Sequence, residues 1–237
     1  MINDTSKPLV LLGSNSALYK LTETCESIGI PIAGIVDKDY YGNTDKICEV
    51  PIIGTEDTFF NDVKNRSKYN FFCATNWSPE NNPIDQRNKN KRAHLVELIE
   101  KLNLDCISIV DTTARVSRHA TIGPGVFIDG NVLLEPEVII GKFSNVMYNT
   151  LIGHHTLVGE NCVIQRGCYI AADCILDDNV YVSVACKLLK PGAKFGENTF
   201  IHDGIYIRRS TIKDEVVSMT SPNQKRIVHY ISEDNND

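Results

Sequence analysis

The fold is decided by the stretch TIGPGVFIDGNVLLEPEVIIGKFSNVMYNTLIGHHTLVGENCVI, residues 121–164, in which an aliphatic residue recurs at every sixth position. The series extends beyond the stretch on both sides and comprises Val110, Val116, Ile122, Ile128, Leu134, Ile140, Val146, Ile152, Val158, Ile164, Ile170, Leu176, Val182 and Leu188. A period of six matches neither the 3.6-residue turn of a helix nor the alternation of a strand. It therefore indicates a supersecondary repeat that returns to the same environment every six residues.

The residues between the aliphatic positions identify the repeat. A small or β-branched residue lies four positions after almost every aliphatic one, and the triplets in between are rich in the turn formers Gly, Pro, Asn and Asp. This hexapeptide pattern resembles the left-handed parallel β-helix of the hexapeptide acyltransferases, in which three hexads make one triangular coil. The resemblance implies coils at 110–127, 128–145, 146–163 and 164–181. The register slips by one residue after Leu188, and the repeat ends near Val217.

The eight cysteines fit the repeat better than a metal or disulfide framework. Four of them, Cys162, Cys168, Cys174 and Cys186, occupy the position of the small residue, where Ser, Thr, Ala and Val stand in other hexads. The remaining four show no C-x-x-C spacing. We therefore expect buried, reduced thiols rather than zinc ligands or disulfides.

The first hundred residues have a different pattern, with short apolar runs alternating with helical segments. Strands are expected at 8–12, 30–36, 50–54, 69–74 and 107–110, and helices at 14–28, from residue 55, and at 90–102. Such alternation predicts a parallel sheet with a ligand crevice at the carboxyl ends of its strands. The segment 76–91 is polar and contains two prolines, which predicts a long loop at the same edge.

A nucleotide site is predicted at the ends of the first two strands. One glycine follows the first strand, without the G-x-G-x-x-G fingerprint of dinucleotide sites. A helix N-terminus with small polar residues suits one phosphate or a ribose. The expected substrate-binding residues here are Gly13, Ser14, Asn15, Ser16, Asp37 and Lys38. The residues leave a plainer interpretation equally open, in which Ser14 caps the helix and Asp37 is a turn residue.

The composition limits the classes of partner. The chain has 237 residues and a formal net charge of −6, which argues against nucleic acid or an anionic membrane surface as a partner. We find no leader peptide or long apolar run in the sequence and expect a cytoplasmic protein that contacts no membrane.

Taken together, the two halves resemble the bacterial nucleotide-sugar N-acetyltransferases that acetylate 4-amino-6-deoxy sugars, of the bacillosamine and sialic-acid type. The resemblance is carried by LVLLGSNS at 9–16, GIVDKDYYGN at 34–43, LIGHHTLVGENCVI at 151–164 and SPNQKRI at 221–227, and it covers nearly the whole chain. It implies a Rossmann-like α/β nucleotide-sugar-binding domain at 1–106, a left-handed β-helix acyltransferase domain at 107–217 and a tail at 218–237. It also implies a homotrimer with acetyl-CoA bound between subunits.

The resemblance assigns roles to individual residues. His154 becomes the general base, since an imidazole with an ordinary pKa of about 6.5 can take a proton from an attacking amine. His155 follows it as the second catalytic residue, at a position where the family has a carboxylate. The other residues with implied roles are Met147 and Asn149 near the substrate, and Ala172, Gly204, Lys225 and Arg226 near coenzyme A. No metal is expected, because adjacent residues of an extended chain point to opposite faces.

The resulting functional hypothesis is an acetyl-CoA-dependent N-acetyltransferase acting on a nucleotide-linked 4-amino-4,6-dideoxy sugar for surface glycan synthesis. Two alternatives stay open at this point. One is a catalytically silent trimeric scaffold that binds a nucleotide sugar, because His155, Met147 and Ala172 depart from the family pattern. The other is an O-acetyltransferase on a related sugar.

Overall fold

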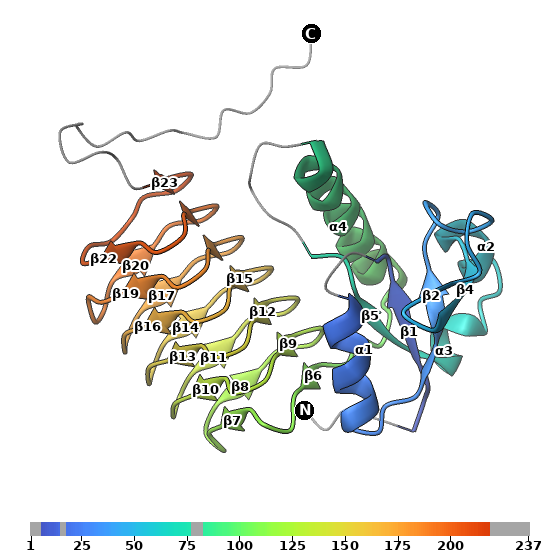
Figure 1. Cartoon of the computed structure of the whole chain (residues 1–237), viewed down its shortest axis with the longest axis horizontal. Coiled ribbons are helices and arrows are strands. Elements are labelled where there is room, and N and C mark those ends of the chain that lie inside the picture. The colour runs from blue at the N-terminus through green and yellow to red at the C-terminus, as the bar shows by residue number, and fades with distance from the viewer. Residues whose placement is uncertain (1–5, 15–17, 77–82, 219–237) are drawn as a thin grey trace, which may run out of the picture. The chain divides into compact units, whose positions relative to one another are not determined.

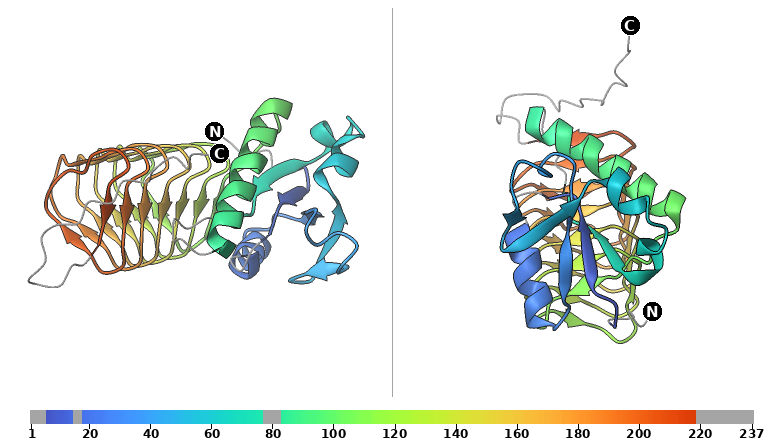
Figure 2. Two further views of the ribbon diagram at one scale, coloured as in Figure 1. Left: turned by 90° about the horizontal axis from the view of Figure 1, so that it is seen from above. Right: turned by 90° about the vertical axis from the view of Figure 1, so that its right-hand side faces the viewer.

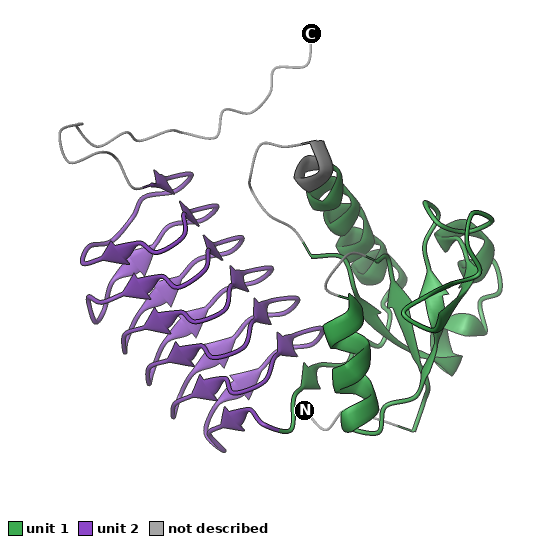
Figure 3. Cartoon of the chain, viewed as in Figure 1, with its two compact units in different colours: residues 1–112 green, residues 113–237 purple. Residues whose placement is uncertain are grey.

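The computed structural model describes residues 6–14, 18–76 and 83–218. The chain separates into two compact units, residues 1–112 and 113–237 (Figure 3). The division lies a few residues after the predicted domain boundary at 106. No helix in the described part of the chain is both long and apolar enough to cross a membrane.

The N-terminal unit is built on a five-stranded sheet. Its strands are β1 (Leu9–Leu12), β2 (Ile32–Val36), β3 (Lys46–Ile47), β4 (Val50–Gly54) and β5 (Asn70–Cys73), in the order β3-β4-β2-β1-β5. All neighbours are parallel except β3, which pairs antiparallel with β4. Strands β1 and β5 are buried along their whole length, as expected for a sheet covered on both faces, although β5 is the last strand of the order. The predicted Rossmann-like α/β fold is confirmed.

Four helices accompany the sheet: α1 (Leu18–Ser27), α2 (Glu56–Phe60), α3 (Asn65–Lys68) and α4 (Pro83–Leu102). The predicted loop at 76–91 is wrong from Pro83 onward, because α4 already begins there. Proline suits the first turn of a helix, where its missing N–H would have no partner in any case. The polar residues that follow include several Gln, Arg and Lys, which are good helix formers, and buried Leu95 and Ile99 anchor the helix further on.

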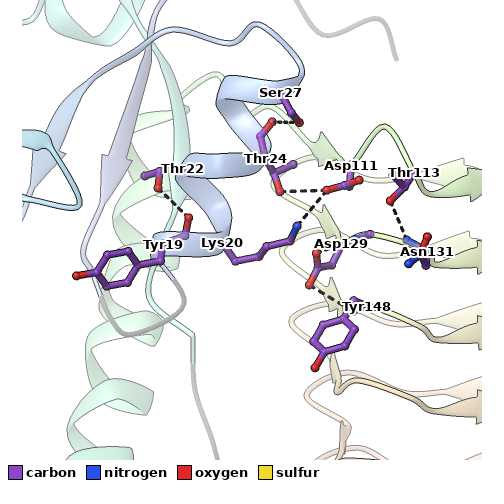
Figure 4. Close-up of polar contacts among 11 residues, drawn as sticks. Tyr19, Lys20, Thr22, Thr24, Ser27, Asp111, Thr113, Asp129, Asn131 and Tyr148 are labelled. Carbon is purple, nitrogen blue, oxygen red and sulfur yellow. Dashed lines mark hydrogen bonds and ion pairs between the residues drawn. The ribbon is translucent and has the colours of Figure 1, made fainter.

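The predicted strand at 107–110 does not close this sheet. Cys106 makes one isolated parallel bridge with Phe71, and β6 (Ile109–Val110) is not among the five strands. Asp111, directly after β6, instead accepts hydrogen bonds from two side chains of α1, Lys20 Nζ and Thr24 Oγ1, each at 3.3 Å (Figure 4). The apolar run therefore leaves the sheet after its first residues.

The second unit is a left-handed parallel β-helix, as predicted, whose two-residue strands stack into three faces (Figures 1 and 2). The first face contains β7 (Arg115–Val116), β10 (Leu133–Leu134), β13 (Leu151–Ile152), β16 (Tyr169–Ile170), β19 (Lys187–Leu188) and β22 (Tyr206–Ile207). The second contains β8 (Thr121–Ile122), β11 (Ile139–Ile140), β14 (Leu157–Val158), β17 (Ile175–Leu176) and β20 (Lys194–Phe195). The third contains β9 (Phe127–Ile128), β12 (Asn145–Val146), β15 (Val163–Ile164), β18 (Tyr181–Val182), β21 (Phe200–Ile201) and β23 (Val216–Val217).

The register of the coils follows the period of six. Leu133 pairs with Leu151, and Leu151 with Tyr169, each 18 residues further on. Lys187 pairs with Tyr206 at a spacing of 19, so the predicted slip after Leu188 is confirmed. The second residue of most of these strands is buried, and these apolar side chains form the core of the β-helix.

Where a Ser, Thr or Cys occupies the position of the small residue, its side chain has a hydrogen-bonding role as well as a packing role. Cys162 Sγ donates to Asp177 O at 3.2 Å, and Cys168 Sγ donates to Ser183 O at 3.1 Å. Thr156 makes the equivalent bond to Ala171 O. Burial raises the pKa of Cys162 to about 12, so this thiol stays protonated and able to donate. The four cysteines of the repeat are buried as predicted, whereas Cys48 and Cys106 are only half-buried.

Candidate active site

The turns of the β-helix stack into columns, and the predicted site residues fall on two of them. We call the column joining the first face to the second the His154 corner; it consists of residues 117–120, 135–138, 153–156, 171–174 and 189–193. The column joining the third face to the first is the Met147 corner, residues 129–132, 147–150, 165–168, 183–186 and 202–205. The first holds His154, His155 and Ala172, and the second holds Met147, Asn149 and Gly204. Within one chain, the predicted residues therefore do not form a single cluster.

The two histidines contact each other directly. Their Nδ1 atoms are 2.9 Å apart, so one ring donates and the other accepts, and the rings meet nearly edge to face at 87°. His155 has a φ of 58°, which places it in the left-handed region and turns the chain sharply. The argument that neighbouring side chains here point to opposite faces is therefore wrong, because the chain is not extended at this turn. The contact leaves Nε2 of His154 available to a substrate.

Two carboxylates lie next to the pair, one in each neighbouring coil. Glu135 Oε2, in the coil before, accepts a hydrogen bond from the backbone N–H of His154 at 2.9 Å. Asp173, in the coil after, donates its backbone N–H to His154 O at 2.9 Å. A carboxylate oxygen of Asp173 and one ring nitrogen of each histidine all lie within 4.8 Å of one another, and all three residues are exposed. The sequence analysis missed Asp173, although its spacing of 18 from His155 places it directly in line.

Stacking at this corner is tight. A Cβ atom on Gly153 would lie 2.6 Å from the backbone nitrogen of Ala172, closer than real contacts allow. Gly153 is thus required by the distance between coils, and Ala172 lies over the turn that carries the histidines.

At the Met147 corner, the hydrogen bonds of the turn explain the residue types at and around position 149. Asn149 has a φ of 58°, and its N–H donates to Gly130 O at 3.1 Å. The neighbouring amide of Tyr148 donates to Asp129 Oδ2 at 3.3 Å (Figure 4), and Asp129 is fully buried. Asn149 therefore serves the turn, and Met147 is half-buried beside it.

In the N-terminal unit, the predicted residues meet at the carboxyl ends of β1 and β2. Ser14 Oγ donates to Asp37 Oδ2 at 2.6 Å, so the side chains of both residues interact with each other. Lys91 of α4 donates to Asp37 Oδ1 at 2.6 Å and to Asp39 Oδ2 at 2.7 Å. The sequence analysis had placed Lys91 in a loop and missed it. Lys38 is exposed beside this network.

The electrostatics of this network favour its charged form. Asp37 is fully buried. Burial alone would lower the pKa of Lys91, but its hydrogen bonds and charge interactions with Asp37 and Asp39 outweigh burial and raise it. The same hydrogen bond from Lys91 lowers the pKa of Asp39. Asp37 accepts hydrogen bonds from Ser14, Lys91 and the backbone amide of Asp39, which together hold the buried carboxylate in place.

The ends of β1 and β5 also approach each other closely. Gly13 has a φ of 72°, and a Cβ on it would lie 2.1 Å from Thr75 Oγ1, so only glycine fits. Thr75 is fully buried, and its Oγ1 has no hydrogen-bond partner among the described residues. Buried Arg92 donates to the carbonyl of Thr75 at 2.5 Å. An unpaired buried hydroxyl at the point where strand order reverses is the kind of group that a bound ligand satisfies.

The remaining predicted site residues are not in the described part of the chain, and a cavity of the N-terminal unit lies elsewhere. Asn15, Ser16, Lys225 and Arg226 lie outside the described residues. One cavity of about 740 Å³ in the N-terminal unit lies at the opposite edge of the sheet, between α1, the residues before β2 and the β3–β4 turn, and contains none of the predicted site residues.

Comparison with known proteins agrees with this architecture. The family model of the GMPPB C-terminal domain matches residues 106–188, about a third of the chain. No curated protein sequence matches the chain. Among solved structures, a variant of perosamine N-acetyltransferase from Caulobacter crescentus, in complex with CoA and GDP-perosamine, is 19% identical with a TM-score of 0.63, covering 89% of this chain and 93% of that one. WeeI from Acinetobacter baumannii AYE is 14% identical with a TM-score of 0.73, covering 90% of this chain and 97% of that one.

These comparisons confirm the fold over both units. The chain is a Rossmann-like α/β domain followed by a left-handed parallel β-helix, the architecture also found in a solved sugar N-acetyltransferase.

Proposed function

We propose that the protein is an acetyl-CoA-dependent N-acetyltransferase that acts on a nucleotide-linked 4-amino-4,6-dideoxy sugar in surface glycan synthesis. The observation that carries the proposal is the exposed histidine pair at a corner of the β-helix, with Nε2 of His154 left free. The shared fold adds support, since the perosamine N-acetyltransferase structure contains CoA and GDP-perosamine. A cytoplasmic location, where acetyl-CoA is made and used, is part of the same proposal.

The proposed reaction uses the pair as a base and its orienting partner. His154 Nε2 takes a proton from the sugar amine as the amine nitrogen attacks the thioester carbonyl carbon. The tetrahedral intermediate then collapses with cleavage of the carbon–sulfur bond, and the proton on His154 passes to the departing thiolate of coenzyme A. His155 holds the ring of His154 through the Nδ1 contact, the position that a carboxylate occupies in the resembling family.

The nucleotide portion is proposed to bind at the carboxyl edge of the N-terminal sheet, at Gly13, Ser14, Asn15, Ser16, Asp37 and Lys38. The structure adds two supporting groups, the unpaired Oγ1 of Thr75 and the ammonium of Lys91. A hydroxyl and an ammonium suit the ribose and phosphate of a nucleotide.

The proposed homotrimer would bury an apolar strip on the second face. Ile139, Leu157 and Ile175 stack 18 residues apart, and their exposures of 45%, 40% and 39% are high for aliphatic residues. Stacked exposed aliphatic residues favour association with another surface. Met147 and Asn149 are proposed to meet the sugar, and Ala172, Gly204, Lys225 and Arg226 the coenzyme A, across subunits. Sedimentation equilibrium of the purified protein tests the trimer.

Mass spectrometry of a substrate panel tests the reaction itself. The protein is incubated with acetyl-CoA and 4-amino-4,6-dideoxy sugars linked to UDP, dTDP or GDP. We expect one panel member to gain a single acetyl group with release of free coenzyme A thiol. Absence of any product together with absence of coenzyme A binding would overturn the proposal. Nucleotide-sugar binding without coenzyme A binding would support the silent scaffold instead, the alternative that His155, Met147 and Ala172 leave open.

A further inference from the structure

The histidine pair and Asp173 have a second chemical capability besides proton transfer. We propose that His154, His155 and Asp173 bind a zinc-class divalent cation. We further propose that this cation inhibits the proposed acyl transfer, because metal-bound His154 cannot accept a proton from the amine. The binding part of the proposal is independent of the proposed function, and only the inhibition rests on it.

The donor set fits a zinc-class cation. Imidazole nitrogen and carboxylate oxygen are common ligands of zinc. With bonds of about 2.0–2.1 Å, ligand atoms around a tetrahedral zinc lie roughly 3.3 Å apart. The two Nδ1 atoms are 2.9 Å apart, and a carboxylate oxygen of Asp173 lies within 4.8 Å of one ring nitrogen of each histidine, so rotation of the three side chains can bring the ligand atoms to the required spacing. Three protein ligands would leave one position open to solvent.

The backbone already holds the three residues in place. His155 N–H donates to Pro136 O at 3.0 Å, and Asp173 N–H donates to His154 O at 2.9 Å, so the turns of successive coils are fastened to each other. His155 and Asp173 have φ values of 58° and 60°, the same left-handed conformation one coil apart. The site therefore needs side-chain rotation but no rearrangement of the backbone.

The surrounding charges also favour a cation. Glu135 and Glu137 lie in the turn of the preceding coil, and Asp173 in the turn of the following one. Lys190, in the coil beyond Asp173, is the cationic side chain that follows in the same column of turns. The turns directly adjoining the histidines thus carry three carboxylates, which attract a divalent ion.

Binding would change the tautomer of one ring and thereby remove the base. In the free pair, one Nδ1 carries the shared proton and the other accepts it. When the cation takes the lone pairs of both Nδ1 atoms, that proton moves to Nε2 of the same ring, with no net release. Both rings then carry a proton on Nε2, and His154 has no lone pair left to accept a proton from the amine.

Isothermal titration of the metal-free full chain with zinc chloride, without substrate, tests the binding. The informative variants are Asp173→Asn and His155→Asn. Asparagine already occupies left-handed turn positions at Asn131, Asn149, Asn161, Asn179 and Asn198, so both variants are expected to fold. The matched control is Glu137→Gln, an exposed carboxylate with a φ of 63° at the same corner. Circular dichroism confirms that the folds are equal.

The titration tests zinc binding separately from zinc inhibition. We expect one zinc ion per chain for wild type and Glu137→Gln, affinity at least tenfold weaker in Asp173→Asn, and loss of that site in His155→Asn. No binding at 100-fold molar excess of zinc, or equal binding in all four proteins, would overturn the inference. Reversal of zinc inhibition by EDTA in wild type then tests the regulatory part. If the substrate panel yields no product, the proposed function fails while the zinc titration still decides the metal site.

Discussion

The two corners of the β-helix place different residues at the same backbone position. Most of these turns contain one residue in the left-handed region, where glycine and asparagine are the least strained, and the turn 117–120 contains none. At the Met147 corner these residues are Asn131, Asn149, Gly167, Ala185 and Gly204. At the His154 corner they are Glu137, His155, Asp173 and Gly192.

The difference shows where the sequence serves the fold and where it does not. At the Met147 corner the residue types are those that the turn prefers, with Ala185 as the exception. At the His154 corner three successive coils carry ionisable side chains at this position: Glu137, which is unusual in the left-handed region, and His155 and Asp173, which tolerate it better than most residues do. Residues that break a local preference mark functional sites more often than structural ones. We therefore propose that the ionisable groups of the His154 corner serve chemistry, and the predictions below test that proposal from the largest effect to the smallest.

Removing the base should have the largest effect. We expect His154→Ala to lower kcat for acetyl transfer by about 10²–10⁴-fold, the usual contribution of a general base, while the melting temperature hardly changes because the side chain is exposed. The measurement is the initial rate of coenzyme A thiol release with the substrate found in the panel. His119→Ala, an exposed histidine at the same corner, should keep the wild-type rate. A His154→Ala rate within twofold of wild type would refute the assignment.

The polar network of the N-terminal unit provides the next test, because Ser14, Asp37 and Lys91 are hydrogen-bonded to one another and mostly buried, whereas the histidine pair is exposed. Lys91→Met leaves the buried Asp37 carboxylate without its ammonium partner, and we expect it to lower the free energy of unfolding by about 3 kcal/mol. Urea unfolding followed by circular dichroism measures the loss. Lys101→Met, an exposed lysine of the same helix, should cost less than about 0.5 kcal/mol. Equal effects of the two variants would show that the network contributes nothing specific.

Adding a methyl group at Gly153, where two coils of the His154 corner are in close contact, should destabilise the protein through steric overlap alone. Gly153→Ala places a Cβ 2.6 Å from the backbone nitrogen of Ala172, and we expect a loss of about 2 kcal/mol. At Gly54 the nearest atom to an added Cβ is a threonine hydroxyl at 3.1 Å, so Gly54→Ala should cost less. Thermal unfolding of both variants checks the order, and a Gly153→Ala protein as stable as wild type would contradict the observed coil spacing.

Relieving the one strained residue of the Met147 corner should have the smallest effect. Ala185 has a φ of 57°, and Ala185→Asn should stabilise the protein by about 0.5–1 kcal/mol because asparagine tolerates this conformation better. A shift of the unfolding midpoint to higher urea measures the gain. Ala120→Asn, at a turn position without positive φ, should bring no gain.

The sequence predicted the fold well because its strongest signal is strictly local. A period of six from Val110 to Leu188 specifies each inward residue of the β-helix, and the slip after Leu188 appears in the register as a change in spacing from 18 to 19. The start of α4 was missed, because a polar segment with prolines has the composition of a loop while its first proline fits a helix start.

The site was predictable only where a motif marks it. The resemblance to a known family predicts His154. It does not predict Asp173 or Lys91, because each of these residues contacts residues that are far from it in the sequence. Lys91 and Asp37 are 54 residues apart, and nothing in the local pattern of either residue encodes their contact. The position of Asp173 could have been predicted, since the 18-residue coil places it over His155. Its closeness to the two histidine side chains depends on the turn conformation, which the period alone does not give.

The claim that the histidine pair carries out acetyl transfer is tested most directly by comparing two variants, His155→Asn and Ala185→Asn. For each variant, the rate of acetyl transfer and the free energy of unfolding are measured. Both substitutions place asparagine at a left-handed turn position of the same β-helix. If His155 is retained for chemistry, both variants will be at least as stable as wild type, and only His155→Asn will lose acetyl transfer, by tenfold or more. If His155→Asn transfers acetyl groups at the wild-type rate, the histidine pair is not the active site.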